Sequence, residues 1–399
     1  MIPLSVLLVF FSLLVLHDAY HLSSTRVKTS GRKLPLALSS SLKDTSPSTD
    51  GAITPTPASE HDLLVRAFRG EKTERTPVWL MRQAGRYMAE FRKYSEKYPF
   101  RQRSETPEIA IELSLQPWRA FKTDGVIMFS DILTPLPAMG VDFTIIPGKG
   151  PKIQNPVKSK GDIEAITVLQ DVGTQVPFLK EILGSLRKET EGKTSLIGFI
   201  GAPWTLAAYS VEGGHSKLCQ NMKKMCLEEP ALAHVMLQKY ADSLCVYASH
   251  QVDSGAQILQ IFESWSHHMG EEMWEAFAKP YASQVAKYLK EKHPDVPVVY
   301  FANGGSAYLH AQTDMPVDAL SLDWKISMKH ARKTAPNTVL AGNVDPMVLY
   351  GSDENIRKAA RHAIEGGCDV LNLGHGVEKD TREEAVAILV DEARRSYKN

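Results

Sequence analysis

Short apolar runs alternate with longer amphipathic stretches along the chain from residue 60 onward. The apolar runs are four to six residues long, and runs of that length are typical of strands buried on both faces of a parallel sheet. They predict eight strands, at residues 77–81, 125–129, 195–200, 257–262, 297–301, 318–322, 338–341 and 369–373.

Apolar positions between these runs recur with the spacing of one helix face. They predict helices at residues 107–121, 176–189, 230–253, 271–290, 326–333, 353–365 and 381–397. Eight strand–helix repeats indicate an α/β fold, a (β/α)8 TIM barrel that forms a single domain over residues 59–399. Residues 138–158 do not follow this rhythm, and their Pro-Gly turn sequence predicts a β-hairpin.

A doubly wound sheet is the alternative arrangement of alternating strands and helices. It requires a glycine-rich phosphate loop after its first strand. The predicted first strand is followed instead by Arg82-Gln83-Ala84-Gly85-Arg86. The sequence has no repeat of fixed period, which argues against a solenoid. We therefore favour the barrel.

Residues 1–58 do not share this pattern. An apolar run at 2–16 would form about 22 Å of helix, which is shorter than a bilayer core of roughly 30 Å. Its length is typical of the apolar region of a signal peptide, although no basic residue precedes it. Residues 21–43 contain five basic residues and no acidic ones, as transit peptides do. Residues 44–58 are rich in Ser, Thr, Pro and Gly and predict a disordered linker.

A signal-like run followed by a transit-like run resembles the bipartite leaders of algae whose plastids lie inside extra membranes. Such leaders are often cut before an aromatic residue, and Tyr20 follows Ala19 at the matching place. We therefore expect residues 1–58 to be a targeting leader and linker, and the mature chain to lie in the plastid stroma without a stable membrane span. A membrane anchor or a secretory signal is the alternative interpretation, with the cytoplasm or the mitochondrion as the other destination.

The overall composition narrows the class of protein. Hydrophobic residues make up 43% of the chain and charged residues 23%, which excludes collagen-like, coiled-coil and disordered chains. The 46 basic and 46 acidic residues balance, whereas a general nucleic-acid binder carries a basic excess. Four cysteines are too few for a disulfide framework. We expect buried thiols in a reducing compartment.

Charged and polar residues follow the predicted strands. In a TIM barrel the C-terminal ends of the strands share one mouth, where active sites lie, so these residues are the candidates for a functional site. They are Arg82 and Arg86 after the first strand, Ser130 and Asp131 after the second, Tyr209 on the helix after the third, Glu263, Ser264 and His267 after the fourth, Asn303 after the fifth, Asp323 after the sixth, Asn343 and Asp345 after the seventh, and His375 after the eighth.

The types of these residues indicate an acidic substrate. Arg82 and Arg86 are four residues apart and would share one face of a helical turn, where their planar guanidinium groups suit carboxylates. The chain has no strand-end His-x-His, strand-end Lys, P-loop or dinucleotide motif. The adjacent His267 and His268 would point about 100° apart on a helix and are expected to be ordinary residues. The residues alone predict a barrel enzyme without metal or cofactor, with one prominent carboxylate deep in its site.

Two longer segments narrow this prediction further. Residues 77–87 read Pro-Val-Trp-Leu-Met-Arg-Gln-Ala-Gly-Arg-Tyr, and residues 198–206 read Gly-Phe-Ile-Gly-Ala-Pro-Trp-Thr-Leu. Both resemble signatures of the uroporphyrinogen decarboxylase family, and the resemblance covers roughly residues 60–397. Supporting blocks occur in the family's order at 129–133, 147–151, 260–265, 322–324, 342–346 and 372–376.

The resemblance implies a (β/α)8 barrel, a homodimer, and no metal or organic cofactor. The implied reaction removes the four acetate carboxyl groups of uroporphyrinogen III and yields coproporphyrinogen III. Catalytic roles are implied for the arginines, the aspartate, the tyrosine and the histidine, with substrate contacts from all of the family's site residues. These residues fall on Arg82, Arg86, Asp131, Tyr209, Phe262, Ser264 and His375.

The chemistry of these residues agrees with the implied reaction. Each pyrrole must be protonated at a ring carbon, which creates a cationic electron sink before CO2 leaves. An ionised Asp131 can accept hydrogen bonds from several pyrrole N–H groups and stabilise that cation, while the arginines hold the carboxylates. The proton donor stays open, because arginine is a very weak acid with a pKa above about 12; an acidic solvent species and a substrate carboxyl are the alternatives.

Two positions depart from the family pattern. Asn303 replaces a common Lys, and residues 377–380 replace a more apolar turn that contains Pro; both concern substrate positioning at the rim.

Two other functions are alternatives. A cobalamin-linked methyltransferase of the same superfamily needs zinc held by His and Cys, and residues 300–303 supply neither. A non-catalytic tetrapyrrole-binding protein would not require the whole set of site residues.

Overall fold

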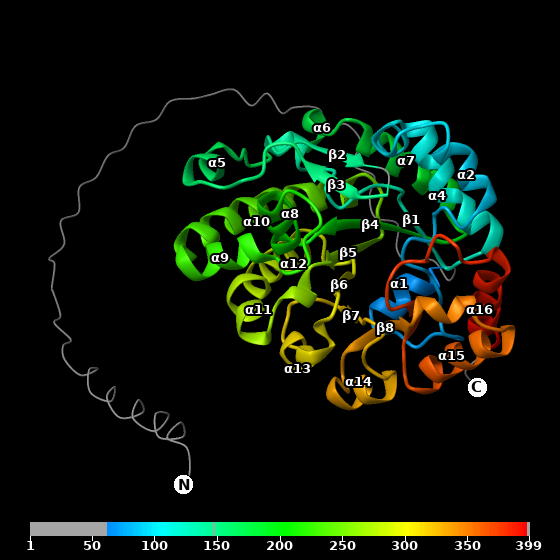
Figure 1. Cartoon of the computed structure of the whole chain (residues 1–399). Helices are drawn as coiled ribbons and strands as arrows, with labels where there is room; N and C mark the ends of the chain where they lie inside the picture. The colour runs from blue at the N-terminus through cyan, green and yellow to red at the C-terminus, as the bar shows by residue number, and fades with distance from the viewer. Residues whose placement is uncertain (1–61, 147, 397–399) are drawn as a thin grey trace, which may run out of the picture. The chain divides into compact units, whose positions relative to one another are not determined.

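The computed structural model describes residues 62–146 and 148–396 and shows a curved parallel sheet surrounded by helices (Figure 1). Within this seven-stranded sheet every neighbouring pair of strands runs parallel, and the order of the strands follows the chain. The strands are β1 Gly125–Ile127, β4 Ser195–Gly201, β5 Ile258–Glu263, β6 Val298–Ala302, β7 Ala319–Ser321, β8 Val339–Val344 and β9 Val370–Leu373. Each lies within two or three residues of a predicted strand.

The predicted first strand closes the sheet into a barrel. Val78 forms a parallel bridge with Leu371 of β9, and the Leu371 N–H donates to the Pro77 carbonyl at 2.8 Å. On the other side, the Val78 N–H donates to a carboxylate oxygen of Asp124, and the Asp124 N–H donates to the Val78 carbonyl, both at 2.8 Å. Residues 77–81 therefore occupy the place of an eighth strand, although they form a bridge there instead of a continuous strand.

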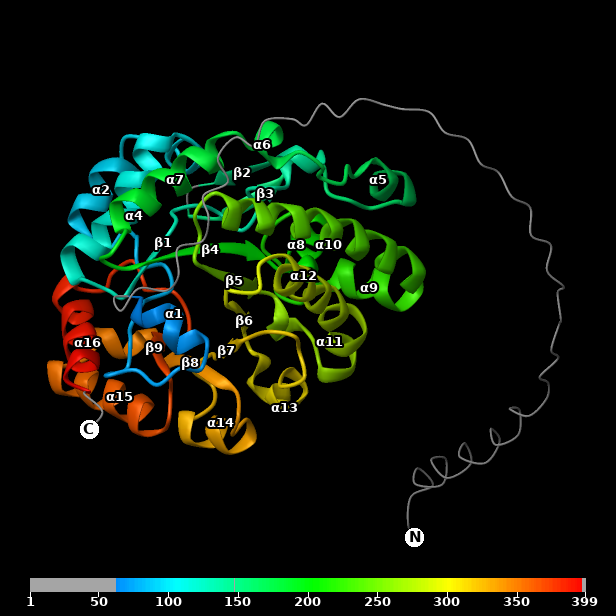
Figure 2. The same ribbon diagram turned by 180° about the vertical axis from the view of Figure 1, so that it is seen from behind.

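Helices cover the outer face of the barrel in both views (Figures 1 and 2). The predicted helix at 271–290 is two helices, because Pro280 has no N–H to donate to the preceding turn. The helices are α1 Leu63–Phe68, α2 Ala89–Ser95, α3 Phe100–Glu105, α4 Pro107–Phe121, α5 Lys160–Ala165, α6 Val172–Gln175, α7 Phe178–Thr190, α8 Pro203–Glu212, α9 Gln220–Glu228, α10 Pro230–Asp253, α11 Glu271–Phe277, α12 Lys279–Lys292, α13 Leu309–Gln312, α14 Met328–Thr334, α15 Asp353–Glu365 and α16 Glu383–Arg395.

The predicted hairpin is confirmed between β1 and the next barrel strand. Its strands, β2 Phe143–Ile146 and β3 Gly150–Ile153, pair antiparallel. Inside the barrel, Phe199, Phe262 and Phe301 from three neighbouring strands meet edge to face, with ring centroids 5.7 and 6.0 Å apart. Such contacts pack the barrel interior and form an apolar layer where the strands end.

The predicted leader, residues 1–58, lies outside the described residues. Among the helices that the structure describes, none combines the length and the apolar character that a membrane crossing needs. All four cysteines, Cys219, Cys226, Cys245 and Cys368, are buried, as the sequence predicted.

Candidate active site

Arg82 directly follows the closing segment of the barrel. Its φ of +53° lies in the left-handed region, and residues 82–86 form a turn instead of a helix. The buried side chain of Gln83 explains this course: its amide oxygen accepts from the Leu80 N–H at 3.4 Å, and its amide nitrogen donates to the Gly125 carbonyl at 3.1 Å. The prediction that Arg82 and Arg86 share one helical face is therefore wrong.

Both arginines are exposed. Within residues 62–146 and 148–396, neither guanidinium group of Arg82 or Arg86 forms an ion pair or a hydrogen bond. Nearby, burial lowers the pKa of Arg103, and the positive charge of Arg86 lowers it further. Uncompensated positive charge of this kind attracts anions, so this side of the mouth is suited to carboxylates.

Asp131 lies two residues beyond Phe129, where the chain turns away from β1. One carboxylate oxygen accepts from the Leu133 N–H at 2.8 Å, and the turn is held by a 3.0 Å hydrogen bond between the hydroxyls of Ser130 and Thr134. Burial raises the pKa of Asp131, whereas the Leu133 hydrogen bond and the charge of Arg82 oppose that rise. In the part of the chain described, the second carboxylate oxygen has no partner and is available to a ligand.

Tyr209 reaches the same region from α8. Its ring packs on Trp265, with the ring centroids 4.7 Å apart. Burial raises the pKa of its hydroxyl; the charge of Asp131 adds to the rise and that of Arg82 opposes it. The hydroxyl therefore keeps its proton at neutral pH and can donate a hydrogen bond.

His375 follows β9 and is half-buried against Trp324, with ring centroids 5.9 Å apart. Burial lowers the pKa of His375 to about 4, and the positive charge of Arg82 and the neighbouring His267 contribute to the shift. The imidazole is therefore neutral near pH 7, with one nitrogen able to donate and the other able to accept.

Arg82 connects these three groups electrostatically. Burial is the main cause of the pKa shifts of Asp131, Tyr209 and His375, and the positive charge of Arg82 also affects all three pKa values. Phe262 is half-buried on β5 and faces the aromatic layer of the barrel, and Ser264 follows two residues later, also half-buried. The structure thus brings Arg82, Asp131, Tyr209 and His375 near one another, and it places Arg86 near Arg103.

Other strand-end residues belong to the framework. Asp323 is fully buried, and its two carboxylate oxygens accept from the N–H groups of Lys325 and Ser306 at 2.7 and 3.3 Å. Asp345 caps the turn after β8 by accepting from the Met347 N–H at 2.9 Å. These acidic residues hold loops and do not add to the group around Arg82.

Sequence reasoning missed three features of this region. The side-chain amide of Asn303 donates to the Ser264 carbonyl at 3.1 Å and lies 3.2 Å from Nδ1 of His267, so Asn303 connects two loops of the rim. His267 and His268 lie in a 3-10 turn with their rings 4.0 Å apart, contrary to the predicted divergence. Arg103 is buried among Phe91, Phe100 and Phe129, and its helical position carried no signal of this role.

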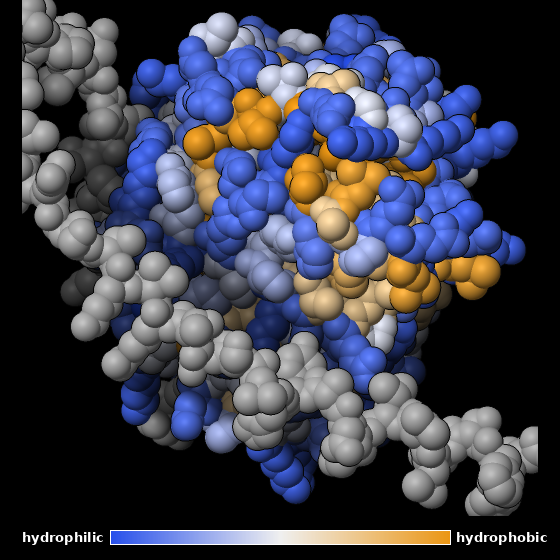
Figure 3. All heavy atoms as spheres, turned by 90° about the vertical axis from the view of Figure 1, so that its left-hand side faces the viewer, coloured by the Kyte–Doolittle hydropathy of each residue, from blue (hydrophilic) through white to orange (hydrophobic). Residues whose placement is uncertain are grey.

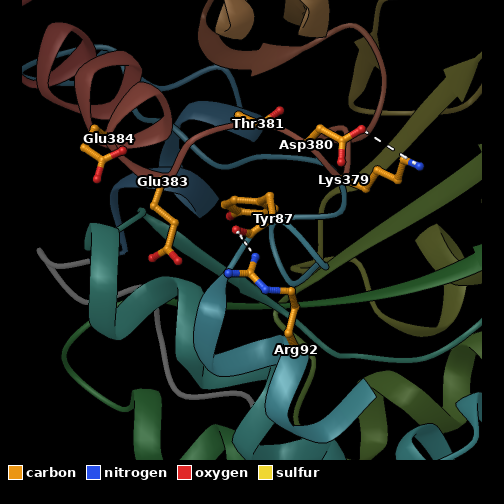
Figure 4. A pocket seen from close by; sticks show the side chains of 7 residues that line it. All are labelled: Tyr87, Arg92, Lys379, Asp380, Thr381, Glu383 and Glu384. Atoms are coloured by element: carbon orange, nitrogen blue, oxygen red, sulfur yellow. Dashed lines mark hydrogen bonds and ion pairs between the residues drawn. The ribbon is translucent and has the colours of Figure 1, made fainter. Parts of the chain in front are cut away.

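A hollow of about 570 Å³ lies beside the arginine turn, and Figure 4 shows the side chains around it. Arg92 donates to the carbonyls of Arg86 and Tyr87, both at 2.9 Å. Glu383 accepts from the Ala89 N–H at 2.6 Å. The hollow therefore borders the backbone support of Arg86. Its lining residues are Tyr87, Arg92, Lys379, Asp380, Thr381, Glu383 and Glu384, so it includes part of the turn at 377–380 and none of the predicted site residues.

Potential metal ligands lie apart from one another in the described part of the chain: within residues 62–146 and 148–396, no three His, Cys, Asp or Glu side chains gather closely enough to hold a metal ion. The predicted independence from metals remains a prediction.

The barrel and its mouth define an α/β-barrel enzyme for an anionic substrate. A model of the uroporphyrinogen decarboxylase family matches residues 59–396, and the chain belongs to that family. It is 47% identical to uroporphyrinogen decarboxylase from Picosynechococcus over 335 residues, covering 82% of this chain and 95% of the relative. It is 45% identical to the Synechocystis uroporphyrinogen decarboxylase over 345 residues, covering 85% and 98% of the two chains.

A solved structure of a methyltransferase from Methanosarcina mazei shares the fold. It superposes with a TM-score of 0.73 and covers 84% of this chain and 98% of its own. At 21% sequence identity, this likeness concerns the fold alone. The predicted TIM barrel is thereby confirmed.

Proposed function

We propose that this chain removes the four acetate carboxyl groups of uroporphyrinogen III, giving coproporphyrinogen III and four molecules of CO2 in tetrapyrrole biosynthesis. Membership of the family and 45–47% identity to the two cyanobacterial enzymes over more than four fifths of the chain support this function. The reaction makes the chain a carboxy-lyase.

The uncompensated charge of Arg82 beside Asp131 is the observation that carries the proposal. The substrate has a rim of carboxylates and a centre of pyrrole N–H groups. Arg82 and Arg86 would bind rim carboxylates, and the free oxygen of Asp131 would accept from the central N–H groups. Neutral His375, the Tyr209 hydroxyl and Ser264 would add hydrogen bonds, and Phe262 would pack on the macrocycle. The positive charge of Arg82 thus matches the carboxylate rim of the substrate, and the negative charge of Asp131 matches its N–H centre.

The chemical step needs a site that stabilises positive charge. Protonation of a pyrrole ring carbon makes a cation, and the bond to the carboxylate then breaks, so its electron pair moves toward the ring and CO2 leaves. Protonation of the exocyclic carbon and loss of the ring proton complete the methyl group, so each turn consumes one proton and releases one CO2. An ionised Asp131 would face the cationic pyrrole and contribute several kcal/mol, as electrostatic groups of this kind do.

The test of this function is incubation of the chain with uroporphyrinogen III under reducing conditions. We expect successive loss of four carboxyl groups together with release of CO2. Chromatography of the oxidised products measures how many carboxyl groups remain. Oxidised uroporphyrin carries the same carboxylates and serves as the control, since its aromatic macrocycle resists protonation at the ring carbon. Tight binding without CO2 release would identify a carrier and contradict the proposal.

A homodimer is part of the proposal. Exposed apolar side chains on the face that carries α9 and α10 support it: Leu218, Leu227 and Val235 are 67%, 75% and 50% exposed, and Figure 3 shows apolar surface on that side. Apolar patches of this kind often mark interfaces. Sedimentation of the chain and of Leu227→Glu tests this surface; a dimer that Leu227→Glu leaves intact would place the interface elsewhere.

Delivery to the plastid stroma is also part of the proposal. The composition of residues 1–58 supports it, as does similarity to enzymes of cyanobacteria, the lineage from which plastids descend. A fluorescent protein fused behind residues 1–58 should accumulate in the plastid. Steady fluorescence in the cytosol would contradict the assignment of the leader.

A further inference from the structure

A buried acid lies directly behind the candidate site. Glu263 is the last residue of β5 and is fully buried. The strand alternates its side chains, so Glu263 points to the opposite face from Phe262, toward the surrounding helices. One carboxyl oxygen accepts from the Thr205 hydroxyl at 2.5 Å. The sequence placed Glu263 with the mouth residues because it follows an apolar run; its burial behind the strand corrects that prediction.

The Thr205 hydroxyl has two hydrogen-bond partners, one at the end of β5 and one just beyond it. It donates to Glu263 and accepts from the Trp265 N–H at 3.3 Å. A hydroxyl has one proton to donate and two lone pairs to accept, so both bonds form together. Glu263 and Trp265 flank Ser264, which is thereby held to α8 from both sides.

Thr205 also stands one helical turn before Tyr209. Residues four apart on a helix lie on the same face, and the Tyr209 ring packs on the Trp265 ring at 4.7 Å. Trp265 therefore contacts α8 twice, through its backbone at Thr205 and through its ring at Tyr209. The relative placement of Ser264 and Tyr209 depends on this double contact.

The surroundings of Glu263 favour the neutral form of its carboxyl group. Burial raises the pKa of Glu263 to about 8, against the opposing hydrogen bond from Thr205. The neighbouring Tyr300 is fixed by a 3.0 Å hydrogen bond from the indole N–H of Trp274. Burial raises the pKa of Tyr300, and a charge on Glu263 would raise it further. A neutral carboxyl that accepts one hydrogen bond acts as a support and not as a counter-ion.

We propose that Thr205 and Glu263 are positioning residues that fix the positions of Ser264 and Tyr209 relative to each other in the mouth of the barrel. The inference rests on the proposed function, because it concerns two residues expected to contact uroporphyrinogen. A displacement of about 1 Å of such groups can cost roughly 100-fold in rate. Successive decarboxylations require four different placements of one macrocycle. If Ser264 and Tyr209 were poorly placed relative to each other, the enzyme should also release partly decarboxylated products.

The experiment compares three threonine variants of the full chain. Thr205→Val removes the hydroxyl at constant shape and should lower kcat/KM at least tenfold, with accumulation of products that keep five to seven carboxyl groups. Thr205→Ser keeps the hydroxyl and should restore kcat/KM to within threefold of wild type. Thr190→Val is the matched control, since Thr190 is also fully buried and its hydroxyl bonds to the Leu186 and Arg187 carbonyls of its own helix; it should keep wild-type turnover.

Two outcomes would overturn the proposal. Thr205→Val with the turnover and product pattern of Thr190→Val would show that the hydroxyl does not set the site. Glu263→Gln keeps a neutral acceptor of the same shape and should stay within threefold of wild type, so a loss beyond 100-fold with an unchanged melting temperature would assign Glu263 a proton-transfer role instead. An inactive wild-type chain would contradict the proposed function and is distinct from both results.

Discussion

Gly376 lies against the stem of Arg82. A Cβ built on Gly376 would fall 2.3 Å from Cδ, 2.6 Å from Cγ and 2.9 Å from Cβ of Arg82. Real Cβ atoms do not approach other atoms so closely, and two of these atoms lie near the start of the arginine side chain. The missing side chain at position 376 therefore sets the path along which the guanidinium group reaches the mouth.

Gly376→Ala should displace Arg82 while the barrel stays folded. We expect kcat/KM to fall by at least tenfold, because the guanidinium group would leave the neighbourhood of Asp131 and His375, and we expect only a small change in melting temperature. Steady-state kinetics and thermal denaturation measure the two effects. Gly161→Ala is the control, since the contact there is an ordinary 3.8 Å; equal kinetics for the two variants would contradict this role of Gly376.

Asp131→Asn should reduce turnover on the order of 100-fold, as the loss of a preorganised electrostatic partner does. Asn keeps the acceptor for the Leu133 N–H and removes the negative charge that would face the cationic pyrrole. Substrate binding should fall less, because Arg82 and Arg86 remain. Asp171→Asn is the control, since Asp171 also accepts from a backbone N–H, that of Thr174, on the surface. Near-normal turnover of folded Asp131→Asn would limit Asp131 to a structural role.

The stability of the chain should depend on pH through Glu263. Its folded pKa of about 8 lies above the ordinary value of 4.5, so the folded state binds more protons between these values. The contribution of Glu263 to stability is therefore complete below pH 4.5 and is lost as the pH rises through 8. Relative to wild type, Glu263→Gln should gain stability from pH 5 to pH 8, by at most about 1.4 kcal/mol per pH unit. Urea denaturation at both values measures this, and a difference that does not change with pH would place the pKa of Glu263 near its ordinary value.

Chelators should leave the activity unchanged. The prediction follows from the types of residue at the strand ends, and the described residues contain no group of three potential ligands. Activity is measured before and after prolonged dialysis against EDTA, with and without added zinc. Reproducible loss that zinc restores would favour the methyltransferase-like alternative.

The strands were predictable because burial on both faces makes each of them a continuous apolar run. The helices α4, α10 and α15 have the predicted bounds; α4 and α10 begin with a proline, and the Ser352 side chain caps α15. The site residues were predictable in kind, since the fold brings strand ends together. Their exact roles were not. The turn at Arg82 depends on the buried Gln83, whose partner Gly125 is distant in sequence, and the orientation of Glu263 depends on which face of β5 it occupies.

The seam of the barrel joins segments from nearly opposite ends of the folded region. Val78 pairs with Leu371, and Gly376 and His375, which follow β9 directly, lie beside Arg82. During synthesis the arginine turn leaves the ribosome long before the residues that shape it. The mouth can therefore be completed only after β9 and the residues behind it have been made, and any chain that stops before β9 would expose a half-built site without its histidine.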